Sequence, residues 1–396
     1  MGWLRGRWSY GLTVLAVCWF GWICIYLTKS IIPPLLPVLS AEWGMSHTQS
    51  GMLETTYIIG YIVVKIPASM LSERFGARKV LALGILGYAA STALMGLAGG
   101  FAVALLLRFL VGFFQGVHLP VANALLSDRF GPKQGRAIGF HESGPNVGNA
   151  LAYPLTVAIA SALSWEWAFI LLSVPAFVLA AMTYALIRDE PREAVKAERG
   201  TVGGLRGYVW LLAPLTLAYA AYGLCLQSLF TFTPSFLVEY QGMDLATAGL
   251  LATLLPAAGF FAKVSSGFVS ERLGRRATIC GATLVTGVTV GLLTVVRGDA
   301  LIAVLFIVMG LGMYVFSPVI YSTVTSTLPS GLKSVGLGVV TIFGNLVGAF
   351  STSIVGALID AGGYRTALLS MSGITIAATV VVYFALGRRA DSTPSS

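Results

Sequence analysis

Charged residues are scarce in this chain. Only 10% of its 396 residues are charged, whereas 56% are hydrophobic. A soluble protein needs more charge than this, so the composition excludes a soluble globular protein. Apolar runs of about 20 residues, the length that crosses a bilayer core of about 30 Å, make up most of the sequence. The chain is therefore predicted to be an all-α membrane protein.

Cysteine is also rare, and the motifs of common enzymes are missing. The four cysteines lie within apolar runs and form no CxxC or Cys/His cluster, so we interpret them as reduced packing residues. The sequence contains no P-loop, no HExxH motif and no nucleophile elbow. We therefore expect no enzymatic activity, no bound metal and no cofactor.

Glycine, proline and charged residues divide the chain into twelve predicted transmembrane helices. Their ranges are 11–39, 48–71, 80–99, 101–126, 137–162, 166–187, 209–237, 246–269, 277–296, 300–326, 335–359 and 366–386. Arg5 and Arg7 precede the first range, as in a signal peptide, but the apolar run is too long, which favours an uncleaved first helix.

The basic residues lie at the ends of these ranges. The net charge of +9 could suggest nucleic acid, but the basic residues form no patch, so we expect no nucleic acid as a partner. Almost all of them fall in one set of connections, whereas the alternate set holds only Arg297 and Arg365. The positive-inside rule then places both termini in the cytoplasm.

An internal repeat organises the chain. The run Lys65–Lys79 and the run Lys263–Arg276 each carry a lysine that is followed eight positions later by Glu-Arg-x-Gly, and matching residues lie 198 positions apart. The polar stretch 188–208 reads as a cytoplasmic linker between two pseudo-symmetric six-helix bundles, 1–187 and 209–396. A repeat of this kind predicts a transporter whose site lies between the bundles at the middle of the membrane.

These runs match the signature cytoplasmic loop motif of the major facilitator superfamily, which the chain resembles over nearly its whole length. The motif is complete at Gly267–Arg276, whereas Ser69 replaces its leading glycine in the first copy. Arg108, Gly112 and Gly116 are similar to the Arg-x-x-x-Gly-x-x-x-Gly motif of the same family. The resemblance implies the major facilitator fold.

Within that family the chain is most similar to the anion:cation symporter branch. Tyr26, Lys29 and Pro37 match the Tyr-x-Asp-Arg…Pro signature of the branch, with Thr28 in place of its aspartate. Gln115 stands where the branch has a glutamate. Because those two carboxylates carry proton coupling in the relatives, their coupling mechanism does not simply carry over to this chain.

A few ionisable residues are predicted at membrane depth, where each charge costs at least about 2.5–3.5 kcal/mol. The cations are Lys29, Lys65, Arg108 and Lys263, the acids are Glu54 and Glu142, and His118 and His141 can titrate. Two positive charges in excess favour an anionic substrate.

Each of these residues has a structural alternative. Lys29 either contacts substrate or pairs with Glu54, and Lys65 and Lys263 either bind substrate or anchor helix ends. Arg108 and His118 have either a functional role or a packing role. The sequence also suggests that Glu142 pairs with Lys263 across the bundles in one state and separates from it when a proton or the substrate replaces the contact.

Helical spacing and the motifs complete the candidate set. Glu54, Ile58, Tyr61 and Lys65 form one predicted polar face, and Glu142, Asn146, Asn149 and Tyr153 form another. The candidate substrate-binding residues are Lys29, Lys65, Lys263, Tyr26, Tyr61, Asn146, Gln227, Tyr314, Tyr321 and Asn345. The candidate coupling and gating residues are Glu142, Glu54, His118, Arg108, Glu73, Arg74, Glu271 and Arg272, of which the last four would latch the bundles together in the outward-facing state.

The sequence thus predicts a secondary active transporter of a small organic anion, coupled to protons and located in a bacterial-type inner membrane. Its partners would be the substrate, protons and the lipid bilayer, and it would work as a monomer. An efflux antiporter of drug-like compounds is the first alternative, because Gly144-Pro145 and Gly148 partly match the antiporter motif. A sensor of transporter ancestry is the second.

Overall fold

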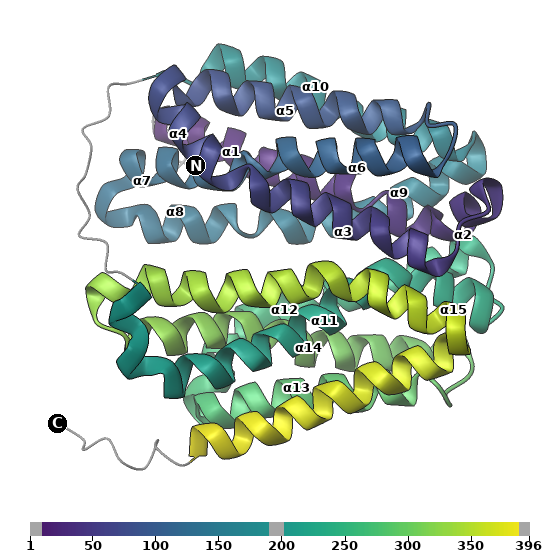
Figure 1. The fold of residues 1–396 in the computed structure, drawn as a ribbon. Helices are drawn as coiled ribbons and strands as arrows, with labels where there is room; N and C mark the ends of the chain where they lie inside the picture. The colour runs from purple at the N-terminus through teal and green to yellow at the C-terminus, as the bar shows by residue number, and fades with distance from the viewer. Residues whose placement is uncertain (1–9, 190–201, 388–396) are drawn as a thin grey trace, which may run out of the picture. The chain divides into compact units, whose positions relative to one another are not determined.

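The computed structural model describes residues 10–189 and 202–387, and every regular element within these ranges is a helix (Figure 1). Contacts divide the chain into two compact units. Unit 1 consists of the residues up to Trp43 together with Leu53–Ala194, and unit 2 consists of Gly44–Met52 together with the residues from Val195 onward. Most of the predicted linker falls in 190–201, outside the described residues.

Unit 1 is built from ten α-helices and a short 3₁₀ turn, η1 (Gly131–Lys133). The α-helices are α1 (Tyr10–Lys29), α2 (Ile32–Trp43), α3 (His47–Val63), α4 (Lys65–Phe75), α5 (Ala77–Met95), α6 (Phe101–Gly116), α7 (His118–Phe130), α8 (Gln134–His141), α9 (Gly144–Ala162) and α10 (Trp165–Leu186). The first turn of α3 belongs to unit 2, because the division falls at Leu53.

Prolines explain where four of the unit 1 helices end. A proline lacks the backbone N–H, and its ring clashes with the carbonyl of the residue four positions earlier. Helices α1, α3, α6 and α8 all end four residues before a proline; the pairs are Lys29 and Pro33, Val63 and Pro67, Gly116 and Pro120, and His141 and Pro145. Four predicted membrane helices are therefore broken in two, and the α3–α4 pair bends by 41°.

Unit 2 contains longer helices. They are the 3₁₀ helix η2 (Val202–Tyr208), α11 (Val209–Ser235), the π-helical η3 (Phe236–Tyr240), α12 (Leu245–Leu273), α13 (Arg275–Leu292), α14 (Asp299–Thr327), the 3₁₀ turn η4 (Ser330–Leu332) and α15 (Lys333–Gly387). Helix α15 bends sharply at Gly363, whose φ of +73° is readily adopted only by glycine (Figure 1). It covers the last two predicted membrane helices.

All twelve predicted ranges coincide with a helix, a helix pair or half of α15. By length and hydropathy, seven helices in the described ranges are able to cross a membrane, or eight when the bent α3–α4 pair is counted as one span. The protein is thus an all-α, multi-pass membrane protein. The count of twelve and the cytoplasmic position of the termini remain predictions.

Glycines let α3 and α6 pack closely within unit 1. A Cβ atom on Gly112 of α6 would overlap the carbonyl of Tyr57 on α3, and one on Gly60 of α3 would overlap the carbonyl of Phe109 on α6. Small residues allow such close backbone approach between membrane helices. This contact sets the distance between the polar side chains of the two helices.

Candidate functional site

A buried charge cluster lies where α1, α3 and α6 meet in unit 1. Glu54 of α3 places Oε2 2.8 Å from Nη2 of Arg108 and Oε1 3.1 Å from Nζ of Lys29. The three residues are only 8% (Lys29), 3% (Glu54) and 2% (Arg108) exposed. The structure therefore shows the contact between Lys29 and Glu54 that the sequence suggested as one alternative, and it adds Arg108 to the pair.

Local folding positions each member of the cluster. Lys29 is the last residue of α1, whose end is set by Pro33. Arg108 precedes Gly112 by one turn, so the close α3–α6 contact carries its guanidinium to Glu54. Arg108 Nε also donates to the carbonyl of Leu53 at 3.4 Å. Two neighbouring residues of α3, Leu53 and Glu54, thus hold the guanidinium in place.

Tyr57 and Gln115 support the cluster. The Tyr57 ring lies 5.1 Å from Lys29 Nζ and 4.6 Å from the Arg108 guanidinium carbon. Its hydroxyl donates to Gln115 Oε1 at 2.7 Å, and Gln115 Nε2 donates to Thr28 Oγ1 at 3.0 Å. The positions of the two coupling carboxylates in the resembled branch, 28 and 115, are thus filled by a neutral hydrogen-bonded pair.

The cluster carries more positive than negative charge. Lys29 and Arg108 contribute two cations, and Glu54 contributes one carboxylate. Two buried cations that contact one carboxylate favour the approach of an anion, because burying charge is costly unless it is paired and hydrogen-bonded. Ser30 Oγ donates to Asn149 Oδ1 at 2.7 Å and so connects α9 to the end of α1 next to Lys29.

Lys65 and Lys263 occupy similar surroundings in separate units. The ammonium of Lys65 lies 4.4 Å from the ring centre of Tyr61 in unit 1, and that of Lys263 lies 5.5 Å from the ring centre of Tyr314 in unit 2. Each cation thus faces an aromatic ring, a contact that stabilises a desolvated ammonium. Both partners are tyrosines, but Tyr61 lies four residues before Lys65, whereas Tyr314 of α14 reaches Lys263 from another helix.

Two histidines form a second buried pair in unit 1. His118 Nε2 and His141 Nε2 lie 3.2 Å apart, and the ring of Trp22 contacts both imidazoles. One nitrogen donates and the other accepts, so the pair shares one proton. The sequence did not predict this contact, because the two histidines lie on different helices and no spacing pattern connects them.

Helix breaks change the predicted polar faces. Glu142 lies in the gap between α8 and α9, so it does not continue the helical face of Asn146, Asn149 and Tyr153 as predicted. Its side chain is 48% exposed, with one carboxylate oxygen 3.7 Å from His141 Nδ1, whereas the other three residues are buried. The other predicted polar face, which runs from Glu54 to Lys65, is interrupted where the helix bends at Val64.

The remaining candidates are distributed over both units. In unit 2, the Tyr321 hydroxyl lies 2.9 Å from that of Tyr219, Gln227 packs beside Gly348, and Asn345 is half-buried. In unit 1, Tyr26 packs against Trp22 at 5.5 Å between ring centres.

The repeated loop motif forms local contacts in each unit. The guanidinium groups of Arg74 and Arg272 lie over the rings of Phe75 and Phe268 at 5.2 and 4.2 Å. The predicted latch between bundles, which includes Glu73 and Glu271, remains a prediction.

Asp189 was not identified from the sequence. Its Oδ1 accepts a hydrogen bond from the backbone N–H of Arg78 at 2.8 Å and so caps α5.

The antiporter-like glycines have a packing role. A Cβ atom on Gly144 would approach Trp22 Cβ to 2.8 Å, and one on Gly148 would approach the carbonyl of Ile23 to 2.6 Å. Both glycines therefore allow α9 to lie directly against α1. This contact explains the motif without a drug-binding site.

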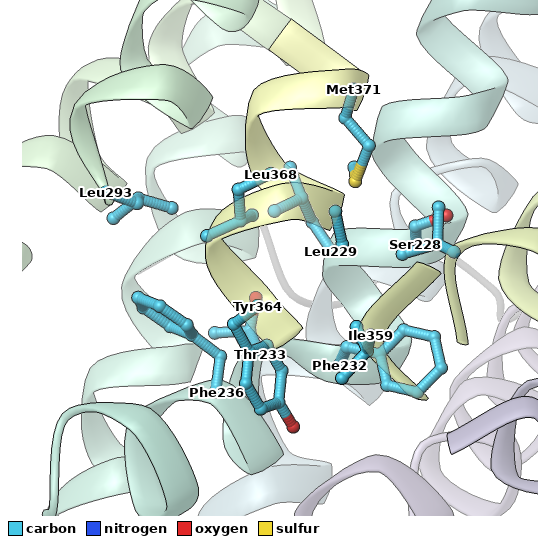
Figure 2. Close-up of a pocket in the computed structure, with 12 residues that line it drawn as sticks. Ser228, Leu229, Phe232, Thr233, Phe236, Leu293, Ile359, Tyr364, Leu368 and Met371 are labelled. Atoms are coloured by element: carbon cyan, nitrogen blue, oxygen red, sulfur yellow. The ribbon is translucent and has the colours of Figure 1, made fainter. Parts of the chain in front are cut away.

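A small apolar cavity lies inside unit 2 between α11 and α15 (Figure 2). Its lining includes Leu229, Phe236, Leu368 and Met371, and its volume is about 20 Å³. That is room for about one water molecule. The cavity is too small for an organic substrate and is a packing feature of this unit.

A family model described as Major Facilitator Superfamily matches residues 18–265 and 215–396. The chain belongs to the Major Facilitator Superfamily. As a member of this superfamily the protein is a transporter and not an enzyme, as the sequence predicted.

Three relatives with named substrates align over most of the chain. The hexuronate transporter of Bacillus subtilis (strain 168) is 24% identical over 395 residues, which cover 94% of this chain and 93% of that protein. The D-galactonate transporter of Escherichia coli O6:H1 is 24% identical, with 89% and 90% covered. A probable sulfoacetate transporter of Cupriavidus necator is 25% identical, with 66% and 65% covered.

A solved structure shares the fold. The crystal structure of a bacterial homologue of the human lysosomal transporter Spinster, inward-facing and unoccupied, superimposes with a TM-score of 0.84. It is 16% identical and covers 98% of this chain and 100% of that one. This likeness supports the major facilitator fold of the protein.

Proposed function

We propose that this protein is a secondary active transporter of a small organic anion, of carboxylate type, which it carries together with a proton across a bacterial inner membrane. One observation carries the proposal: two buried cations, Lys29 and Arg108, both contact the carboxylate of Glu54. A substrate carboxylate is the natural second counter-ion for this pair, because Arg and Lys both bind carboxylates strongly.

Glu54 is the proposed coupling group. As long as it is ionised, its two oxygens occupy the cations that the substrate needs. When Glu54 takes up a proton it no longer neutralises them, so the substrate carboxylate binds in its place. Proton and anion then bind together and leave together, which is the requirement for symport.

The relatives support an anionic substrate. Hexuronate, D-galactonate and sulfoacetate, the substrates in the names of the three relatives, are all small organic anions. Their transporters align over 66–94% of this chain. The shared chemistry of these substrates, an acid group on a small polar carbon skeleton, is therefore the class we propose here.

Transport would proceed by alternating access of the two bundles. The sequence-based hypothesis assigns part of this cycle to Glu142, which would pair with Lys263 in one state. Glu142 now competes with Glu54 for the coupling role, and two variants separate them. Glu142→Gln should keep the proton dependence of transport if Glu54 is the coupling group, whereas Glu54→Gln should lose it. The reverse result would assign coupling to Glu142.

The symmetric lysines have different proposed roles. Lys65→Gln should weaken substrate binding, whereas Lys263→Gln should chiefly disturb the conformational cycle. Binding to the purified protein and transport in proteoliposomes measure the two effects. Equal effects of both substitutions would instead indicate a simple anion clamp.

A thermal-shift panel tests the substrate class. The purified protein is heated with monocarboxylates, dicarboxylates, sugar acids, sulfonates, nitrate or cationic drugs, since a ligand that binds the folded state raises its Tm. Stabilisation by organic acids supports the proposal. Stabilisation only by cations would overturn it in favour of the efflux antiporter.

A further inference from the structure

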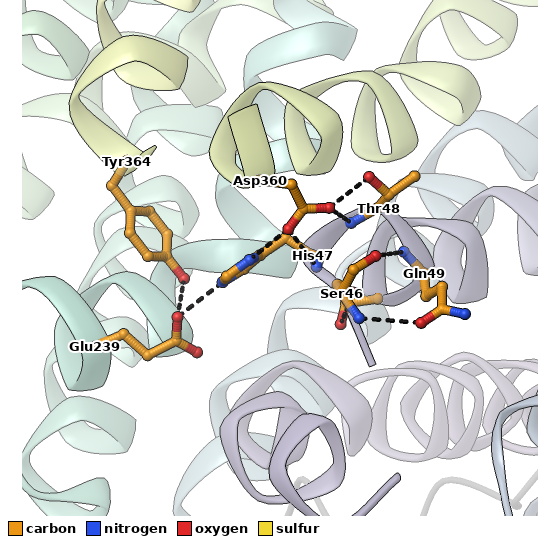
Figure 3. A network of polar contacts seen from close by, with 8 residues as sticks. Ser46, His47, Thr48, Gln49, Glu239, Asp360 and Tyr364 are labelled. Atoms are coloured by element: carbon orange, nitrogen blue, oxygen red, sulfur yellow. Dashed lines mark hydrogen bonds and ion pairs between the residues drawn. The ribbon is translucent and has the colours of Figure 1, made fainter. Parts of the chain in front are cut away.

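A polar network anchors the first turn of α3 to unit 2 (Figure 3). We call it the His47 clasp; it consists of His47, Thr48, Glu239, Asp360 and Tyr364. The Asp360 carboxylate of α15 accepts from the backbone N–H groups of His47 and Thr48, each at 2.9 Å, and from Thr48 Oγ1 at 2.6 Å. Asp360 thus caps a helix that lies more than 300 positions away in the sequence.

The imidazole of His47 lies between two carboxylates. Its Nδ1 is 2.9 Å from Asp360 Oδ1, and its Nε2 is 2.8 Å from Glu239 Oε2. An ionised carboxylate only accepts hydrogen bonds, so both ring nitrogens must donate. Only the protonated imidazolium has two N–H groups. The arrangement therefore matches a positively charged His47 between two negative groups.

Within the described residues, two carboxylates and two aromatic rings face the His47 imidazole. Glu239 lies on η3, Asp360 and Tyr364 lie on α15, and the ring of Phe232 on α11 is 6.4 Å away. The Tyr364 hydroxyl donates to Glu239 Oε2 at 3.0 Å. No second cation shares this network in the described part of the chain, so the proton on His47 is the positive charge that holds the two acids together.

Backbone contacts place the clasp where it can act on α3. A Cβ atom on Gly356 of α15 would overlap the carbonyl of His47, and one on Gly51 would overlap the carbonyl of Thr352. Thr352 Oγ1 also donates to the carbonyl of Gly51 at 3.0 Å. Beyond Met52 the same helix belongs to unit 1 and carries Glu54, seven residues after His47.

We propose that the His47 clasp is a proton-sensitive latch that holds the first turn of α3 on unit 2 while His47 is protonated and releases it when His47 loses its proton. Histidine is the side chain that changes charge between about pH 5 and pH 8. The His47 side chain is 30% exposed, so protons can reach it from solvent. The latch is strong at low pH and weakens as the pH rises, because a neutral imidazole keeps only one of the two bonds.

The latch adds a second proton-dependent step to the proposed transport cycle. This role of the latch rests on the proposed function, because it matters for transport only if Glu54, on the same helix, is the coupling group. The basic residues predict that this end of α3 faces the outside, so an acidic exterior would keep the latch closed. Opening the first turn of α3 would then respond to external pH independently of the proton on Glu54.

Hydrogen–deuterium exchange on the intact protein, without substrate, tests the latch. The amides of His47 and Thr48 should be protected at pH 5.5 and, after correction for intrinsic exchange, lose about tenfold in protection by pH 8. His47→Gln should give the low protection at every pH, since glutamine cannot donate to two carboxylates. His47→Arg, which stays charged, should give high protection at every pH.

Asp244→Asn is the matched control, because Asp244 caps α12 through the N–H groups of Ala246 and Thr247 in its own turn. Asp244→Asn should leave the rate of amide exchange in residues 44–52 unchanged, whereas Asp360→Asn should raise that rate. Unchanged exchange in α13 would show that each variant is folded. Protection of 44–52 that is independent of pH in the wild type, or equal in His47→Gln, would overturn the latch. Since no substrate is used, this result is separate from any failure of the transport proposal.

Discussion

Glu54 holds Arg108 with one carboxylate oxygen, at 2.8 Å, and leaves the other oxygen for Lys29. Removal of either partner of a buried ion pair leaves an uncompensated charge, which costs about 3–5 kcal/mol. A charge change at Glu54 therefore alters both cations at once.

Glu54→Gln should uncouple transport from protons while it preserves anion binding. Glutamine keeps an oxygen that accepts from Arg108 but carries no charge, so both cations stay available to the substrate. In the wild type, anion affinity should fall by up to about tenfold per pH unit as the pH rises, as expected for one linked proton. In the variant the affinity should be flat with pH, and substrate exchange should persist without accumulation driven by a pH gradient.

Binding at several pH values and uptake into proteoliposomes measure these effects. Glu166→Gln on α10 is the control, since it removes a carboxylate of the same unit outside the cluster. A variant that still accumulates substrate against its gradient in response to pH would reject Glu54 as the coupling group.

Arg108→Gln should lower both stability and anion binding, whereas Lys29→Gln should mainly lower anion binding. Arg108 is 2% exposed and bonds both Glu54 and the Leu53 carbonyl, so its loss should cost about 3–5 kcal/mol of stability as well as binding. Lys29 lies at a helix end, so its loss should lower anion affinity at least about tenfold with a smaller fall in Tm. Lys133→Gln, at an exposed position of η1, should change neither. The idea fails if Lys29→Gln binds the anion as tightly as the wild type.

The sequence predicted the helical ranges and the main charged residues, but not all of their partners. Lys29, Glu54 and Arg108 could be selected because they are ionisable residues at predicted membrane depth, where an unpaired charge is costly. Tyr57 could have been found as well, since it lies three residues after Glu54 and so on the same helix face. The prolines that end α1, α3, α6 and α8 were visible in the sequence, but a proline inside an apolar run either kinks or ends a helix, and packing decides which.

Other features depend on contacts that no local pattern encodes. His118 and His141 meet because α7 and α8 pack side by side. His47 and Glu239 lie at the ends of helices, and Asp360 lies just before the bend of α15 at Gly363. Charged residues at such positions are ordinarily solvated, so nothing in the sequence distinguished these three from loop residues. The segment 44–52 packs with the second unit although it lies within the first predicted bundle.

Gln115→Glu tests the charge balance of the cluster. Gln115 bonds Tyr57 and Thr28 close to the two cations, and a carboxylate there would cancel the excess positive charge. Anion affinity at neutral pH should fall at least about tenfold and recover as the pH is lowered and the new acid is protonated. Titration calorimetry at two pH values gives both quantities. Gln134→Glu, at the exposed start of α8, should leave them unchanged, and equal affinity in both variants would contradict the charge argument.

Gly112→Ala should separate α3 from α6 and so disturb the site without touching a charged residue. The new methyl group would overlap the Tyr57 carbonyl, and overpacking of a tight contact typically costs about 1–3 kcal/mol. The shift should lengthen the Arg108–Glu54 contact, so the variant should lose anion affinity together with thermal stability. Gly139→Ala on α8 is the control, because nothing lies within 4 Å of its added Cβ atom. It should match or exceed the wild-type Tm, since alanine favours a helix over glycine by about 1 kcal/mol. If Gly112→Ala keeps full affinity while its Tm falls, the α3–α6 contact supports the fold but does not set the geometry of the cluster.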